Sequence, residues 1–188
     1  MKITTTNPGD KEMVILVNRL DEPTGTMEKM QAHVEGKLHR AFSAFIFNSK
    51  GELMMHRRAL SKYHSPGLWT NTCCSHPRPG EKLDDAVRRR LMEELGFTCP
   101  VHHAFSFVYK KDVGHGLTEH ELDHVFIGWY DGLVIPNPKE VDAVTFRNMS
   151  SVYNDIDARP EKFTEWFKIC FPLVEKFMDR EITRSLAI

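Results

Sequence analysis

The sequence predicts an α/β fold in which a β-sheet is covered on both faces by helices. Short apolar runs with strand character precede and separate two long segments whose apolar residues recur every three or four positions. The chain has 188 residues, of which 41% are hydrophobic and 27% are charged, which is enough for one well-packed core. We therefore expect a single domain over residues 1–188, with residues 1–12 as a flexible arm.

Turn-forming residues bound the expected strands. Residues 14–17 form the first apolar run, and two further runs flank the turn Asn-Ser-Lys-Gly at 48–51, which predicts a β-hairpin over 42–58. Later strands are separated by glycine, proline and asparagine clusters. They are expected near 104–111, 122–130 and 143–147.

The two helices are predicted from apolar stripes. Residues 82–95 place leucine and valine on one face and aspartates in the first turn, and Gly96 ends the helix. The last helix has a longer stripe and contains Pro172, where a kink is expected. Its stripe consists of Phe163, Trp166, Phe167, Cys170, Phe171, Val174, Phe177 and Met178.

Composition argues against several kinds of partner. The formal net charge is −1, so no overall field attracts nucleic acid or an anionic membrane. No apolar stretch is long enough to span a bilayer, and we expect a cytoplasmic protein that is a monomer or a weak homodimer. The four cysteines are expected to be free thiols, with Cys99 and Cys170 buried in packing.

Residues that could bind a metal occur in three short groups along the sequence. They are His33, His39, Cys74, His76, Glu119 and Glu121. If 119–121 is a strand, both carboxylates point to one side and His120 to the other. Imidazoles with carboxylates suit manganese, zinc or iron better than calcium. Because the chain has 10 histidines, a chance grouping or half of a structural zinc site are open alternatives. The other histidines are expected at the surface or in packing: His56, His64, His102, His103, His115, His120 and His124.

Two charged segments can be interpreted either as part of a phosphate-binding site or as ordinary solvent-exposed surface. Arg57, Arg58 and Lys62 could clamp a diphosphate, or form a plain basic loop. Arg89 lies four residues before Glu93, and Arg90 lies four residues before Glu94. On a solvated helix face this spacing gives two weak salt bridges. A carboxylate at position 94, after the loop that contains the cysteines, could instead hold magnesium for a phosphate ligand.

Residues 75–97 resemble a degenerate Nudix box, in which Arg89-Arg90 stands where Arg-Glu is usual and the initial glycine is absent. These two departures weaken a nucleoside diphosphate hydrolase interpretation. Several segments in order resemble type I isopentenyl diphosphate isomerase, a branch of the Nudix superfamily, over about residues 14–170. They are Thr-Met-Glu-Lys-Met-Gln-Ala-His at 26–33, Leu-His-Arg-Ala-Phe-Ser at 38–43, Arg-Arg-Ala-Leu-Ser-Lys at 57–62, Pro-Gly-Leu-Trp-Thr-Asn at 66–71, Cys-Cys-Ser-His-Pro at 73–77 and Glu-His-Glu at 119–121.

The resemblance implies a Nudix-like mixed sheet between helices and a set of site residues. The catalytic positions correspond to Cys74, Glu121, Tyr109 and Trp166. One transition-metal ion, Mn²⁺, Zn²⁺ or Fe²⁺, would be held by His33, His39, His76, Glu119 and Glu121. Mg²⁺ would be held by Glu94 and the Cys74 backbone, and the diphosphate would face Lys29, Arg58, Lys62 and Arg90.

The implied activity moves the double bond of isopentenyl diphosphate by protonation at C4 and deprotonation at C2. We expect Glu121 with Tyr109 to donate the proton to C4 and Cys74 to remove the proton from C2. The Trp166 ring is expected to face the cation. Basic neighbours are expected to lower the Cys74 pKa from about 8.5. Two other hypotheses remain: a Nudix hydrolase that would tolerate Cys74→Ala, and a noncatalytic module stabilised by zinc.

Overall fold

A computed structural model describes residues 12–186 of the chain. The predicted flexible arm lies outside the described residues except for its last residue. Glu12 itself is held to the fold, because its backbone oxygen accepts a hydrogen bond from Lys29 N at 2.8 Å.

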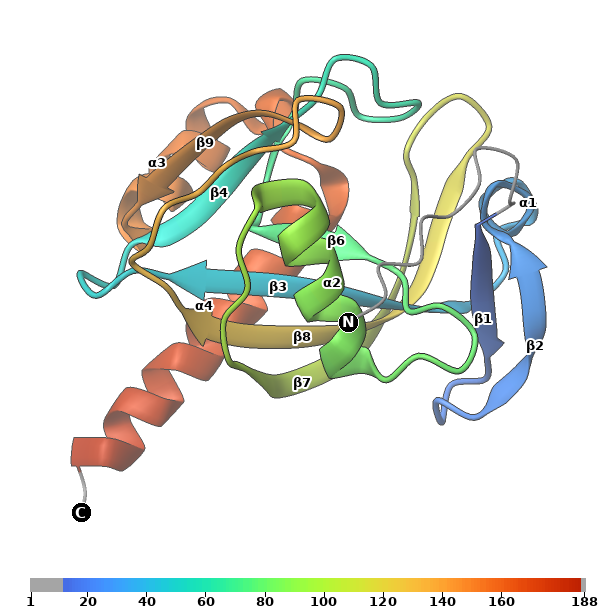
Figure 1. Ribbon diagram of the computed structural model, residues 1–188, viewed down its shortest axis with the longest axis horizontal. Helices are drawn as coiled ribbons and strands as arrows, with labels where there is room; N and C mark the ends of the chain where they lie inside the picture. Colours follow the sequence, from blue (N-terminus) through green and yellow to red (C-terminus); the bar gives the residue numbers. More distant parts are fainter. Residues whose placement is uncertain (1–11, 187–188) are drawn as a thin grey trace.

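The elements of the described residues form one mixed sheet with helices around it (Figure 1). The strands are β1 Met13–Val17, β2 Pro23–Glu28, β3 His39–Phe47, β4 Leu53–Arg58, β5 Trp69–Thr70, β6 Cys73–Ser75, β7 Val101–Asp112, β8 Thr118–Trp129 and β9 Val141–Arg147. The helices are α1 Lys29–Glu35, α2 Leu83–Leu95, α3 Met149–Ala158 and α4 Glu165–Leu186, with a 3-10 turn at Pro160–Lys162.

Strand β3 is the centre of the sheet. It runs parallel to β8 and antiparallel to β1, β4 and β6. β7 pairs antiparallel with β8, and β4 pairs with β5 and β9. Parallel and antiparallel pairs in one sheet confirm the predicted mixed α/β class.

The alternation of side chains along β3 explains the layers. Phe42, Ala44 and Ile46 belong to the core under α2, whereas Phe45 and Phe47 belong to the core under α4. Figure 1 shows α2 on one side of the sheet and α4 on the other. The predicted sheet with helices on both faces is therefore confirmed.

The strongly patterned elements agree with expectation. The hairpin turn at 48–51 joins β3 to β4, with Phe47 paired to Leu53. The helix predicted at 82–95 is α2, and the last helix is α4, which includes Pro172. The elements that were not predicted are β2, α1, β5, β6 and α3, although α3 has an apolar stripe that packs on the core under α4. β2 is mostly exposed, and α1 has 7 residues, too few for a stripe.

No helix among residues 12–186 combines the length and hydropathy needed to cross a membrane. All four cysteines are free thiols, as expected, and Cys99 and Cys170 are buried in the two cores.

Gly96 ends α2 in a left-handed conformation with φ 73°, and its amide donates to Met92 O. A Cβ at this position would lie 2.7 Å from Ile135 O. We expect Gly96→Ala to lower the free energy of unfolding by about 1–3 kcal/mol, measured by urea denaturation. Gly51 is the matched control, because its φ is 74° but a Cβ there meets nothing within 4 Å. Equal losses in both variants would contradict a steric role for the contact with Ile135.

Candidate active site and metal centre

The sheet register aligns three polar residues of the site. Tyr109 on β7 pairs with Glu121 on β8, and Glu121 pairs with His39 on β3. Tyr109 Oη donates to Glu121 Oε2 at 2.6 Å and approaches Glu119 Oε2 at 3.0 Å. The two carboxylates thus share a face, as predicted. His120 lies on the other side, with its Nδ1 2.9 Å from Gly36 O.

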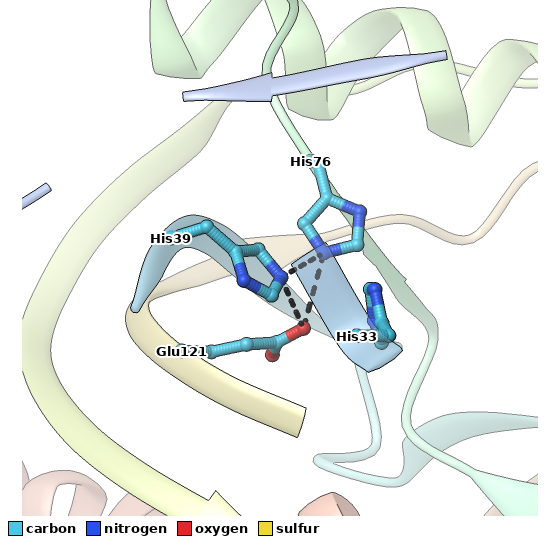
Figure 2. A group of neighbouring side chains, drawn as sticks. All are labelled: His33, His39, His76 and Glu121. Carbon is cyan, nitrogen blue, oxygen red and sulfur yellow. Dashed lines mark hydrogen bonds and ion pairs between the residues drawn. The ribbon is translucent and has the colours of Figure 1, made fainter. Parts of the chain in front are cut away.

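A compact donor group lies at one end of this row. His33 from α1, His39 from β3, His76 after β6 and Glu121 from β8 have ligand atoms that all lie within 4.8 Å of one another. Figure 2 shows His39 Nε2, His76 Nε2 and Glu121 Oε1 converging, with His76 Nε2 at 3.0 Å from the carboxylate. Residues far apart in sequence therefore meet as a possible metal centre.

Hydrogen bonds fix the tautomers of two of these histidines. His33 Nδ1 lies 2.7 Å from Lys29 O, and His39 Nδ1 lies 2.8 Å from Lys37 O. Carbonyls only accept, so Nδ1 carries the hydrogen and Nε2 is left with a lone pair for a cation. Burial lowers the pKa of His33, and it lowers the pKa of His76 to about 4. Neutral imidazoles with one carboxylate fit a divalent transition ion.

The carboxyl groups of Glu119 and Glu121 have different environments. Burial raises the pKa of both, but the imidazoles of His39 and His76, whose Nε2 atoms lie 3.5 and 3.0 Å from Glu121 Oε1, hold the pKa of Glu121 well below its usual range. Burial and the Glu121 charge raise the pKa of Glu119. Glu119 is not part of the four-residue donor group, and its assignment as a metal ligand stays a prediction.

The donor group His33, His39, His76 and Glu121 is predicted to bind a divalent metal ion. Adding Mn²⁺ at 100 times its Kd should stabilise the fold by about 2.7 kcal/mol and raise the Tm accordingly. His39→Ala removes one of the converging nitrogens and should abolish most of that shift. His102→Ala, at an exposed position, serves as the control that keeps it. A shift of the same size in the His39 variant would contradict the assigned centre.

The adjacent thiols of β6 point to opposite faces of the sheet. Cys73 is packed in the core under α2, whereas Cys74 is half-buried and contacts the core under α4. Cys74 lines the same cavity as Tyr109, Glu121 and Trp166. Adjacent strand positions make only one of the two thiols available to this cavity.

The expectation that basic neighbours lower the Cys74 pKa is wrong. Burial and the nearby Asp123 carboxyl raise the pKa of this thiol, although hydrogen bonds to Ser43 and Asn71 act in the other direction. Three of the predicted basic residues of the cavity, Lys29, Lys62 and Arg90, form ion pairs with Glu12, Glu140 and Glu94. Cys74 is therefore a protonated thiol in this structure.

The four basic residues predicted to face a diphosphate line the same cavity. Lys62 Nζ lies 2.5 Å from Glu140 Oε2, and Lys29 pairs with Glu12. Arg58 lies over the Trp166 ring, with its Cζ 5.2 Å from the ring centroid.

The helix pairs differ in exposure. Arg90 pairs with Glu94, and their side chains are 16% and 6% exposed, so a solvated salt bridge is the wrong description of this pair. Glu94 lines the cavity. Arg89 Nη1 lies 3.2 Å from Glu93 Oε2, with side chains 19% and 39% exposed, and Arg89 also forms a shorter pair with Glu81 at 2.7 Å, so only the Glu93 side of this second pair is solvated.

Several residues near the site were not singled out from the sequence. His64, expected at the surface or in packing, is buried and lines the cavity, with its ring 5.7 Å from that of Trp166. Burial and the Arg58 charge lower the His64 pKa to about 3. Other such residues are Ser43, His56, Tyr63, Asn71, Asp123 and Glu140. The alternation that pairs 119 with 121 extends to Asp123 and could have identified it.

Comparison with known proteins identifies the fold class. A model of the NUDIX domain matches residues 37–167. A crystal structure of DR0079 from Deinococcus radiodurans superposes with a TM-score of 0.66 at 24% identity, covering 78% of this chain and 90% of that one. A MutT protein from Methanosarcina mazei gives a TM-score of 0.61 at 23% identity, covering 77% and 94%. The chain is thus a Nudix-domain protein.

Curated relatives narrow this class. Isopentenyl-diphosphate Delta-isomerase 2 of Aromatoleum aromaticum is 49% identical over 164 residues, which is 87% of this chain and 87% of the relative. The isopentenyl-diphosphate Delta-isomerase of Pectobacterium atrosepticum is 44% identical over 87% of this chain and 92% of its own length. The chain belongs to the isopentenyl-diphosphate Delta-isomerase family.

Proposed function

We propose that this protein interconverts isopentenyl diphosphate and dimethylallyl diphosphate by two proton transfers, as an enzyme of isoprenoid biosynthesis. The observation that carries the proposal is that Cys74 and the hydrogen-bonded pair Glu121–Tyr109 line one cavity. Proton donors and acceptors from separate strands thereby face a common space, whose lining also contains four basic side chains.

The reaction balances in two steps. In the forward direction a proton joins C4, the electron pair of the C3–C4 double bond forms the new C–H bond, and positive charge develops at C3. A proton then leaves C2, and its bonding pair forms the C2–C3 double bond. We assign the first transfer to Glu121 with Tyr109 and the second to Cys74 as a thiolate. The protonated thiol and ionised Glu121 are the forms from which the reverse direction starts.

An alkene is a very weak base, so the donor has to lie dry and in contact with it. Tyr109, Glu121 and Trp166 are buried, with 7%, 8% and 4% exposure. An indole face stabilises a cation by about 2 kcal/mol when desolvated. The Arg58 guanidinium already lies over the Trp166 ring, which supports the capacity of this face to accept positive charge.

The metal assignments belong to the same proposal. His33, His39, His76 and Glu121, with Glu119, would hold one Mn²⁺, Zn²⁺ or Fe²⁺ ion, which supplies positive charge and fixes the ligand carboxylate when bound. Glu94 and the Cys74 backbone would hold Mg²⁺ for the diphosphate. Lys29, Arg58, Lys62 and Arg90 would bind the diphosphate oxygens, and this remote binding positions the hydrocarbon.

A cytoplasmic location completes the proposal. It is supported by four cysteines in the free thiol form, which reducing compartments maintain.

Product analysis tests the activity. The metal-loaded protein is incubated with isopentenyl diphosphate, and both the hydrocarbon product and free phosphate are measured. Isomerisation predicts dimethylallyl diphosphate with no phosphate release. Release of phosphate or a monophosphate would instead assign the chain to the hydrolytic chemistry of other Nudix proteins. Loss of fold on chelation without turnover of either kind would indicate a binding module.

A further inference from the structure

Three buried polar residues surround the Cys74 sulfur and have no part in the chemistry above. Ser43, Asn71 and Asp123 are 2%, 0% and 1% exposed. The Cys74 thiol donates to Asn71 Oδ1 at 2.9 Å, and Ser43 Oγ lies 3.4 Å from Cys74 Sγ. Two fixed polar groups therefore contact the sulfur directly.

The orientation of Asn71 is set by its own hydrogen bonds. Its Nδ2 donates to Ala44 O at 3.0 Å and to Cys73 O at 3.1 Å, which uses both amide hydrogens. Oδ1 is left to accept from Thr70 Oγ1 at 2.9 Å and from the Cys74 thiol. A rotated amide would lose these bonds, so this acceptor is fixed in place.

Ser43 is fixed in turn by Asp123, whose Oδ2 accepts from Ser43 Oγ at 2.8 Å. The other carboxyl oxygen of Asp123, Oδ1, has no hydrogen-bond partner among the described residues. Burying a carboxyl group with an unsatisfied oxygen is costly, and the next residue on the same face of β8 is the apolar Val125. Packing alone therefore does not account for an aspartate here.

The strand register delivers this arrangement from separate parts of the chain. Ser43 on β3 pairs directly with Cys74 on β6. Asp123 on β8 pairs with Ala41, which lies two residues before Ser43 and on the same face of β3. The row of contacts from Asp123 through Ser43 to the sulfur thus crosses three neighbouring strands.

We propose that Asp123 and Ser43 are positioning residues that, together with Asn71, hold the Cys74 sulfur against C2 of the substrate. This inference rests on the proposed isomerase function. Asp123 holds the Ser43 hydroxyl, and the hydroxyl oxygen and Asn71 Oδ1 set the direction of the protonated Cys74 thiol, which is the form that has received the C2 proton and that returns it in the reverse direction. Displacement of a reacting atom by about 1 Å can cost on the order of 100-fold in rate.

The first test compares variants of Ser43. Ser43→Ala should lower kcat on the order of 10- to 100-fold while KM and metal content stay unchanged, because the basic residues and the metal centre are untouched. Ser43→Thr keeps the hydroxyl and should restore most of kcat. Asp123→Asn keeps the volume but weakens the acceptor, and should lower kcat by less than Ser43→Ala.

An isotope effect separates positioning from a general loss of stability. With substrate carrying deuterium on C2, the ratio of protium to deuterium rates should be larger for Ser43→Ala than for the unmodified protein, because C2–H cleavage limits the rate more strongly. The solvent isotope effect, which reports the proton delivered to C4, should not increase. Tyr109→Phe should show the opposite pattern.

Ser106→Ala is the matched control, because it also removes a serine hydroxyl that contacts β8. The Ser106 hydroxyl lies 2.9 Å from Nδ1 of His124, the residue that follows Asp123. This variant should leave both isotope effects unchanged. An unaltered kcat in Ser43→Ala, or a lower kcat with an unaltered C2 isotope effect, would overturn the inference while the unmodified protein still isomerises. An inactive unmodified protein would overturn the proposed function itself.

Discussion

Replacing Cys74 by alanine is expected to lower kcat by at least about 1,000-fold, because removal of the proposed proton acceptor at C2 leaves no replacement for it. The half-buried thiol lies in the cavity with the Glu121–Tyr109 pair, and β6 directs the adjacent Cys73 to the other face of the sheet. KM should change little, since the basic residues that would bind the diphosphate remain. Steady-state conversion of isopentenyl diphosphate measures both constants.

The matched control for that prediction is Cys99→Ala, which makes the same change in the core under α2. It should lower the Tm through a small cavity and retain activity. Near-normal turnover by the Cys74 variant would contradict its proposed role. Such a result, with phosphate release, would favour the hydrolase alternative.

Glu121→Gln is expected to lower kcat on the order of 10,000-fold and to lower the metal occupancy as well. The same carboxyl group accepts a hydrogen bond from Tyr109 Oη at 2.6 Å and lies 3.0 Å from His76 Nε2. One substitution therefore affects both the proton-transfer pair and the donor group. Metal content by elemental analysis and kcat should be measured on the same preparation.

Tyr109→Phe separates the two roles of that site. It removes the hydroxyl but leaves the His33, His39, His76 and Glu121 group intact. This variant should lose part of kcat and keep its metal. Full metal occupancy in Glu121→Gln would remove the carboxylate from the proposed centre, and full activity would remove it from the chemistry.

Much of the site was expected from the sequence, partly from the family resemblance and partly from patterns on regular elements. Alternation on β8 placed Glu119 and Glu121 on one face, and Glu94 was singled out by its position at the end of the helix that follows the loop after Cys74. His33 lies on a helix of 7 residues that has too few positions for a periodic pattern. Its helix is held by the Glu28 side chain at one end and by Gly36 at the other, which only the structure reveals.

The environment of Cys74 could not be predicted in the same way. Ser43, Asn71 and Asp123 come from three separate segments, and their contact with the sulfur depends on the register of β3 with β6 and β8. Local sequence shows the basic residues nearby but not the burial of the thiol. For that reason the expected direction of the Cys74 pKa shift was wrong.

The burial of the Arg90–Glu94 pair could not be predicted from the sequence either. Their four-residue spacing describes both a surface salt bridge and a buried pair, and only the position of α2 over the cavity distinguishes them. His64 lies outside any periodic element, in the segment between β4 and β5, so no pattern in the sequence placed it beside Trp166.

The most direct test of the central claim is proton NMR of the metal-loaded protein with magnesium and isopentenyl diphosphate in heavy water. Two proton transfers predict that dimethylallyl diphosphate forms with deuterium in the methyl group derived from C4, and that the Cys74→Ala variant yields none. Isopentenyl diphosphate that stays unchanged and free of deuterium, in the presence of folded, metal-loaded protein, would contradict the account.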